Sequence, residues 1–324
     1  MINFIEYLRY YNIEKDFSNA GNYNTEHSKL LNEGILHSIR NGKFTILTGL
    51  VGSGKTTTVK ILKNDLENDK KIITARLFSS DKRKVGINEL YAALFFDIQT
   101  DKDFKIPSQG EAKARKLIEL IKQKRKTVAL FIDDAHGLHG NTLISIKTLI
   151  ENIESESCNL SVILVGHPKL KNDISKPIME EIGARANIFS QDGVLGAMEH
   201  YIQWLLRECI SEEKTIEEII DKNAIEFLSK KLVTPLQVNF YLKKCFEIGF
   251  EANIKPINIE VAEKAVVNDI ESYPAKLSRA GYSITALTEY LGATSREIKT
   301  YLAGQLNTPR AQYFNNEIYK LGIV

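Results

Sequence analysis

One octapeptide limits what this chain can fold into more than any other feature. Gly49–Thr56 reads G-L-V-G-S-G-K-T and matches the phosphate-loop pattern G-x-x-x-x-G-K-[ST] at every specified position. The apolar run Phe44–Thr48 before it predicts a strand, and Thr56–Leu66 after it predicts a helix. Glycines let backbone amides wrap an anion, and the amino end of a helix adds partial positive charge. We therefore predict an α/β fold in which a strand-to-helix turn binds phosphate.

Two side chains of this loop have predicted roles toward a nucleoside triphosphate and its magnesium ion. We expect Lys55 to reach the β and γ phosphates of ATP, and the Thr56 hydroxyl to bind Mg²⁺. A glycine turn without function is the alternative, but it leaves the lysine, the threonine and the strand–helix context unexplained. The residues predicted to bind the nucleotide are Gly49, Gly52, Ser53, Gly54, Lys55, Thr56 and Thr57.

Polar residues follow two later apolar strands. Val128–Ile132 leads directly into Asp133 and Asp134. Because the carboxyl ends of parallel strands face the ligand crevice, we predict that Asp133 ligates Mg²⁺ and that Asp134 polarises the attacking water. A pair of acids that merely starts a loop is the alternative.

The next predicted strand is Leu160–Val165, and Gly-His-Pro follows it. We predict that His167 contacts the γ phosphate or the attacking water; a loop histidine without a role is the alternative. His136 and His139 have H-x-x-H spacing, but no further ligand residues accompany them in the sequence. We therefore predict no zinc site from that spacing.

Strand and helix patterns alternate as far as Ile188, which predicts a parallel sheet covered by helices on both faces. After Asp192 only helical patterns follow. The predicted strands are 44–48, 72–77, 127–132 and 160–165, and the later helices are 196–208, 223–231, 235–250 and 260–270. We expect four parts: an N-terminal extension (1–22), an α/β nucleotide-binding core (23–192), a helical lid (193–272) and a C-terminal helical section (273–324). The last section is predicted to begin with a proline break at Pro274.

Charge and composition narrow the class of protein. The 43 basic and 41 acidic residues nearly cancel, so any nucleic-acid surface must be local. The three cysteines are far apart, which favours reduced thiols. Met1–Tyr11 contains charged residues and is not typical of a signal peptide, and the longest apolar runs are too short to cross a membrane. We expect a cytoplasmic protein without a membrane partner.

The order of these motifs resembles that of AAA+ ATPases. More narrowly, the phosphate loop, the Asp-Asp-Ala-His strand end and the Val-Gly-His-Pro turn resemble the ExeA/TniB/TnsC-like group, which includes transposition-associated ATPases. The resemblance spans residues 23–270, and Thr234–Asn239 is similar to a lid motif of the group. It implies a P-loop AAA+ core with a parallel sheet, followed by an all-helical lid.

The resemblance also implies roles for single residues. Asp134 stands where the family usually has glutamate; its shorter side chain implies slow or partner-stimulated hydrolysis. His167 matches the sensor position. Arg185 lies near the place where the family supplies an arginine finger to the neighbouring subunit, although an ordinary surface arginine is the alternative. Leu236 departs from the arginine that many relatives carry after the lid proline, which puts a lid sensor in doubt.

Two local surfaces suit double-stranded DNA. Lys82, Arg83 and Lys84 follow the second predicted strand, and a solvated loop is the alternative. Ile284–Leu291 and Ser295–Leu302 predict a helix–turn–helix in which Ser295 caps the second helix. Arg296 and Lys299 would then face outward, toward DNA. A unit that docks a protein partner or simply packs on the lid is the alternative. From residue 275 onward the chain has six basic and three acidic residues, which mildly favours DNA.

If the resemblance holds, the protein forms rings or helical filaments on DNA with ATP and Mg²⁺. It then recruits a DDE-type transposase, and its own hydrolysis of ATP disassembles the filament. An ExeA-like secretion ATPase, a replication or plasmid-maintenance initiator, and a nucleotide-gated scaffold with negligible hydrolysis are the alternatives that the residues leave open.

Overall fold

The computed structural model describes residues 4–77, 85–99, 104–192, 196–266, 270 and 272–322. The chain divides into two compact units. The α/β unit comprises Leu30–Leu50 and Lys55–Asp192, and the helical unit comprises Met1–Lys29, Val51–Gly54 and Gly193–Val324. Over the described part of the chain, every helix is too short or too polar to cross a bilayer.

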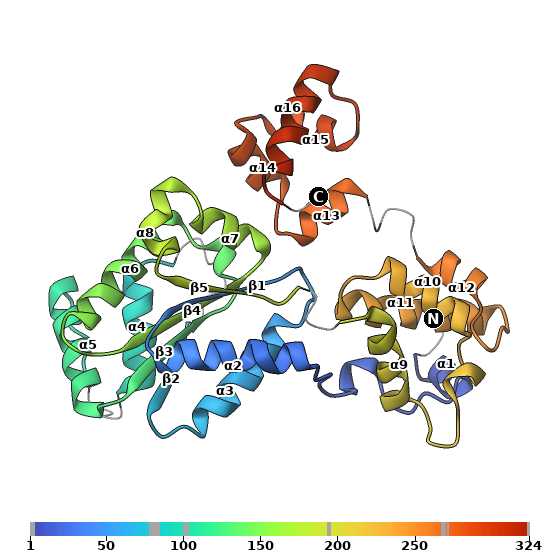
Figure 1. The fold of residues 1–324 in the computed structure, drawn as a ribbon, viewed down its shortest axis with the longest axis horizontal. Helices are drawn as coiled ribbons and strands as arrows, with labels where there is room; N and C mark the ends of the chain where they lie inside the picture. Colours follow the sequence, from blue (N-terminus) through green and yellow to red (C-terminus); the bar gives the residue numbers. More distant parts are fainter. Residues whose placement is uncertain are drawn as a thin grey trace. The chain divides into compact units, whose positions relative to one another are not determined.

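The α/β unit is built on a sheet in which the described residues form five strands (Figure 1). The strand order is β2-β3-β4-β1-β5, and every neighbouring pair is parallel. The parallel sheet predicted from the alternation of strands and helices is therefore confirmed. The strands are β1 (Phe44–Thr48), β2 (Ile72–Arg76), β3 (Thr127–Ile132), β4 (Leu160–Gly166) and β5 (Ala186–Ser190).

Helices cover both faces of this sheet, because its central strands are apolar on both sides. In β1, Leu47 packs in a cluster with α2 (Glu26–Arg40) and α3 (Lys55–Glu67). Its neighbour Ile46 belongs to the larger cluster on the opposite face. The helices of that face are α4 (Ile87–Ile98), α5 (Gly110–Lys124), α6 (Gly140–Glu154) and α7 (Pro168–Ile174).

The helical unit has its own core, to which the first residues of the chain contribute. The Tyr11 ring lies 4.8 Å from that of Phe246, and its hydroxyl donates to the Ile254 carbonyl at 2.6 Å. Thr234 caps the helix Pro235–Glu251. Pro235 occupies the first turn of that helix, where its missing amide hydrogen has no partner to lose. The helices are α1 (Phe4–Tyr10), α9 (Met198–Cys209), α10 (Lys222–Lys231), α11 (Pro235–Glu251) and α12 (Ile259–Ala265).

The C-terminal residues form α13 (Tyr273–Arg279), α14 (Ile284–Leu291), α15 (Ser295–Leu302) and α16 (Thr308–Tyr319). Gly292 ends α14 in a left-handed conformation at φ 57°, as expected for the turn of the predicted helix pair. Two details of the prediction were wrong. Thr294, not Ser295, caps α15, because its hydroxyl accepts the Glu297 amide while the Glu297 carboxylate accepts the Thr294 amide. Pro274 lies inside the first turn of α13 and does not break it.

Other differences from the predicted elements are local. The edge strand β5 and the helices α1 and α2 were not predicted, and α12 ends earlier than expected. Short segments complete the described chain: η1 (Phe17–Asn19), η3 (Ala135–Gly137), η4 (Pro177–Met179), α8 (Glu180–Gly183) and η5 (Ile216–Glu218).

Candidate nucleotide-binding site

Three adjacent strands of the α/β unit end at one edge of the sheet. The strand β4 lies between β3 and β1, and all three run in the same direction. The phosphate loop therefore follows β1 at the same edge where Asp133 follows β3 and His167 follows β4. The carboxyl edge of a parallel sheet is where such folds bind ligands.

Lys55 begins α3 and is only 9% exposed. Its amine donates to the carbonyls of Gly49 and Leu50, each at 2.8 Å. Burial lowers the pKa of Lys55, while the negative charges of Asp192, Asp133 and Asp134 act in the opposite direction. The amine of the predicted phosphate-binding lysine thus lies in the field of both predicted acids and of Asp192.

The loop has the backbone that a phosphate cradle requires. Gly52 and Gly54 have φ angles of 80° and 97°, in the left-handed region that only glycine adopts without strain. Ser53 is buried, and its hydroxyl has no hydrogen-bond partner among the described residues. Thr56 and Thr57 are exposed in the first turn of α3, where backbone amides have no partner within the helix. These donors fit the phosphates of a nucleotide, and the Thr56 hydroxyl oxygen is a suitable ligand for its metal ion.

The two aspartates that follow β3 differ in their exposure to solvent. Asp133 is half-buried, and its carboxylate accepts the backbone amide of Asp134 at 2.9 Å. Asp134 is exposed and has a φ angle of 53°, which is uncommon for a residue with a side chain. The turn that follows, η3, leads back toward the end of β4 and includes His136.

His167 lies at the start of α7, and its ring contacts that of His136. The ring centroids of His136 and His167 are 3.9 Å apart. Burial lowers the pKa of His167 to about 4, and the adjacent His136 ring and Lys55 act in the same direction. Burial also lowers the pKa of His136, against the charge of Asp134. Both rings are therefore neutral near pH 7.

Two residues after β5 hold the phosphate loop from the neighbouring strand. The Asp192 carboxylate accepts the Leu50 amide at 2.9 Å. The Gln191 amide donates to the Thr48 carbonyl at 2.7 Å, and its side chain accepts the Thr58 hydroxyl at 3.1 Å. Sequence reasoning missed both residues because it did not identify β5, although polar residues after a strand were the signal used for Asp133.

Comparisons with known proteins agree with this geometry. Residues 39–173, which include β1 to β4 and their polar ends, match the family model described as an AAA domain. The match covers less than half of the chain, so the chain is similar to AAA domains over these residues. Its fold is the AAA+ P-loop fold predicted above, and the implied ligands of this ATPase domain are ATP and Mg²⁺.

Among curated proteins, the chain is 27% identical over 152 residues to general secretion pathway protein A of Aeromonas hydrophila. That match covers 44% of this chain and only 26% of the relative. Among solved structures, the ORC2 protein of Aeropyrum pernix, solved as ADPNP–ADP complexes, has a TM-score of 0.53 at 10% identity, covering 95% of this chain and 90% of that one. Drosophila ORC bound to DNA has a TM-score of 0.52 at 12% identity, covering 96% and 80%.

Arg185 of the α/β unit lies at the other edge of the sheet. It directly precedes β5, whose first residue pairs with Phe44 at the start of β1. Its guanidinium forms an ion pair with Glu151 at 2.8 Å, and its side chain is 57% exposed. Arg185 lies beside the start of β1, whereas the phosphate loop follows the end of β1. The length of the strand therefore separates Arg185 from the phosphate loop of its own chain.

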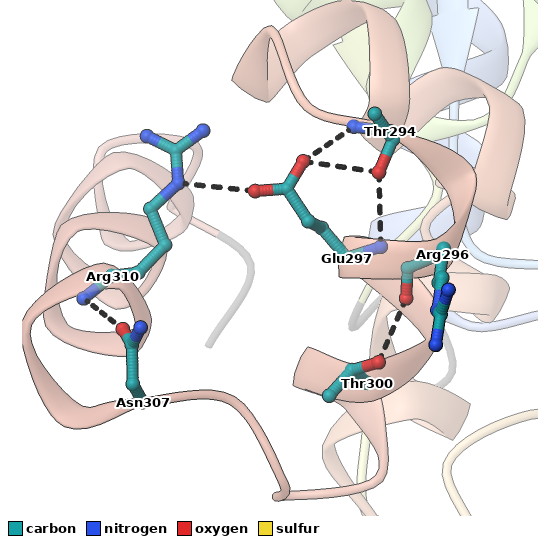
Figure 2. Close-up of polar contacts among 6 residues, drawn as sticks. All are labelled: Thr294, Arg296, Glu297, Thr300, Asn307 and Arg310. Carbon is teal, nitrogen blue, oxygen red and sulfur yellow. Dashed lines mark hydrogen bonds and ion pairs between the residues drawn. The ribbon is translucent and has the colours of Figure 1, made fainter.

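The predicted DNA contacts are only partly within the described residues. Lys82, Arg83 and Lys84 lie outside them. Figure 2 shows the amino end of α15, where Glu297 binds Thr294 and reaches Arg310, whose Nε lies 3.6 Å from the carboxylate.

Arg296 and Lys299 are one turn apart on α15, and both are exposed. Ile298 and Tyr301 of the same helix are buried. The helix thus buries its apolar side and leaves the two predicted basic contacts on its exposed side.

Proposed function

We propose that this chain is an ATP-dependent DNA-binding ATPase that assembles on DNA and regulates transposition by recruiting a DDE-type transposase. The observation that carries the ATPase part is the convergence of Lys55, Asp133 and Asp134 at the carboxyl edge of the sheet. In this proposal Lys55 binds the phosphates, and Thr56 and Asp133 hold Mg²⁺. Asp134 orients the attacking water, and His167 contacts that water or the γ phosphate.

The position of Arg185 supports self-assembly, if this residue is the arginine finger. A finger that stabilises transition-state charge must reach the γ phosphate, yet Arg185 lies at the opposite edge of its own sheet. It can serve only a neighbouring subunit, so each complete site needs two chains arranged head to tail. Such heterologous contacts close into rings or continue as helical filaments.

DNA binding is supported by the exposed Arg296 and Lys299 on α15 and by the basic segment Lys82–Lys84. Cations of this kind neutralise backbone phosphates without reading bases, which gives binding that tolerates sequence and depends on salt. The transposition role rests on the resemblance of the motifs to the ExeA/TniB/TnsC-like group.

Complementation between two inactive variants tests the shared site. Arg185→Ala keeps its phosphate loop but lacks the finger, whereas Lys55→Ala keeps the finger but lacks the lysine. We expect each variant alone to lose ATP turnover, by about 10³-fold for the finger, and the mixture to regain part of it. The matched control mixes Arg185→Ala with the double variant, which supplies neither group. A mixture no more active than this control would refute the shared site.

Assembly on DNA is tested by electron microscopy of the protein with duplex DNA, with and without a non-hydrolysable ATP analogue. Rings or filaments that require both the analogue and DNA are expected. Adding a cognate transposase should then change the turnover rate or the retention of filaments. Particles that stay monomeric under all conditions would contradict the proposal.

An initiator-type ATPase is the second candidate. It is favoured by the helix–turn–helix pair α14–α15 and by the likeness of fold to ORC proteins, one of them solved on DNA. An initiator prefers one duplex sequence by several kcal/mol, whereas a target selector that binds backbone does not. Competition between random and selected duplexes separates the two. The partial match to a general secretion pathway protein keeps a secretion role as a third candidate.

A further inference from the structure

A cluster of three potential metal ligands lies beside the phosphate loop. Asp134 and His136 come from the turn after β3, and His167 comes from the end of the neighbouring strand β4. One ligand atom from each side chain lies within 4.8 Å of those of the other two. Two imidazole nitrogens and one carboxylate oxygen form a ligand set that zinc and related transition metals use in proteins.

A second observation points to a ligand for this cluster. The Nδ1 atoms of His136 and His167 are both buried, and neither has a hydrogen-bond partner among the described residues. A buried polar atom without a partner is destabilising, so two such atoms in contacting rings point to a ligand. An ion shared by the rings provides the missing interaction for such atoms, and neutral imidazole is the form that binds metals.

The backbone holds the two histidines close together. A Cβ atom on Gly166 would lie 3.2 Å from the His136 backbone nitrogen, which is tighter than most such contacts, so glycine favours this close approach of the η3 turn to the end of β4. Ala135 anchors the same turn in the core at 1% exposure. The proximity of the rings is therefore built into the packing of two strand ends.

His139, the second histidine of the H-x-x-H spacing, does not belong to this cluster. Its Nδ1 accepts the Asn141 amide at 3.2 Å and thereby caps α6. The cysteines are poor competitors for the metal, because a thiol binds metal as the thiolate. Burial raises the pKa of Cys158, Cys209 and Cys245 and so disfavours the thiolate form.

We propose that Asp134, His136 and His167 form a binding site for a divalent transition metal such as Zn²⁺, which leaves a coordination position open and inhibits ATP hydrolysis by engaging the Asp134 carboxylate. Mg²⁺ prefers oxygen ligands, so it does not compete for the imidazoles. The metal site stands on the geometry alone. Its inhibitory effect rests on the proposed function, because it requires that Asp134 orient the attacking water.

Binding is tested on the full chain without nucleotide, by titrating Co²⁺ and recording its visible absorption and by titrating Zn²⁺ in a calorimeter. One site per chain is expected, with the intense absorption of low-coordinate Co²⁺. His136→Asn and His167→Asn should each weaken Zn²⁺ binding by about 10- to 100-fold or more. Even the loss of a residue that only hydrogen-bonds to a metal ligand weakens metal binding by this factor. The matched control is His27→Asn, an exposed histidine of α2 that should bind metal like the wild type.

Metal binding that survives both substitutions, or the absence of any such binding in the folded wild type, would overturn the site. Circular dichroism of each variant confirms that the fold is intact before titration.

Inhibition is tested by ATP turnover at a fixed excess of Mg²⁺ with increasing Zn²⁺. Wild type and His27→Asn should lose activity in parallel, while the activity that remains in His136→Asn should be insensitive to Zn²⁺. Equal inhibition of all three proteins would instead indicate chelation of the nucleotide and overturn the regulatory part. If the wild type has no turnover at all, the proposed hydrolysis fails, yet the Co²⁺ spectrum still decides the metal site.

Discussion

Replacing Gly166 by alanine should loosen the junction between the ends of β3 and β4. An added Cβ would lie 3.0 Å from Leu170 Cδ2 and 3.2 Å from the His136 backbone nitrogen. Leu170 is 1% exposed, so its methyl group has little room to move away. The backbone nitrogen can move only with the whole η3 turn. Both neighbours therefore resist the new methyl group.

Overpacking a well-filled core by one carbon costs about 1–3 kcal/mol, which lowers the thermal midpoint of the unit by about 2–10 °C. Displacement of the η3 turn also moves Asp134 and His136. We therefore expect Gly166→Ala to reduce ATP turnover and to weaken Zn²⁺ binding.

The assay is urea unfolding followed by circular dichroism. Fluorescence is unsuitable because the single tryptophan, Trp204, lies in α9 of the helical unit. The matched control is Gly110→Ala, at an exposed position of α5 where a Cβ meets no atom within 4 Å. That change should stabilise the chain by about 0.4–1 kcal/mol. If both variants were equally stable, the close approach of η3 to β4 would be refuted.

Three further changes test other parts of the structure. Asp192→Ala removes the carboxylate that accepts the Leu50 amide of the phosphate loop. Because this carboxylate is exposed, we expect a loss of only about 1 kcal/mol of binding free energy, or about fivefold in ATP affinity. Unchanged equilibrium binding of ATP would mean that the loop does not depend on Asp192. Burial raises the pKa of Asp16, but hydrogen bonds, above all from Lys243, outweigh it, so the folded pKa lies below the ordinary 3.8. Its stabilisation is present above that pH and is lost as the pH falls below it, so Asp16→Asn should destabilise the chain at neutral pH and not in strong acid, as urea midpoints at several pH values can establish. Tyr11→Phe deprives the half-buried Ile254 carbonyl of its donor and should cost about 1 kcal/mol. Tyr10→Phe, at an exposed hydrogen bond, should cost less, and equal urea midpoints would argue against the contribution of the Tyr11 contact.

Local patterns were sufficient for the elements that contain their own signals. The phosphate loop, β1, β3 and β4 could be predicted because glycine spacing and continuous apolar runs are properties of neighbouring residues. The cap of α15 was also within reach, since Thr294 and Glu297 have the spacing of a capping box, whereas Ser295 does not.

Features that depend on contacts between distant residues could not be predicted in this way. The strand β5 is short, and its residues are half-buried or exposed, so it lacks the apolar run that marked β3 and β4. The contact of His136 with His167 arises only because β3 and β4 are neighbours in the sheet. The H-x-x-H spacing drew attention to His139 instead, whose actual partner is a backbone amide of α6.

The central claim is that ATP binds where the loop after β1 meets the acidic end of β3. Equilibrium binding of ATP with Mg²⁺ to Lys55→Ala tests it most directly, with Lys60→Ala, an exposed lysine of the same helix, as the matched control. The account predicts that Lys55→Ala loses measurable binding while Lys60→Ala binds like the wild type. Equal affinity of the two variants would contradict it.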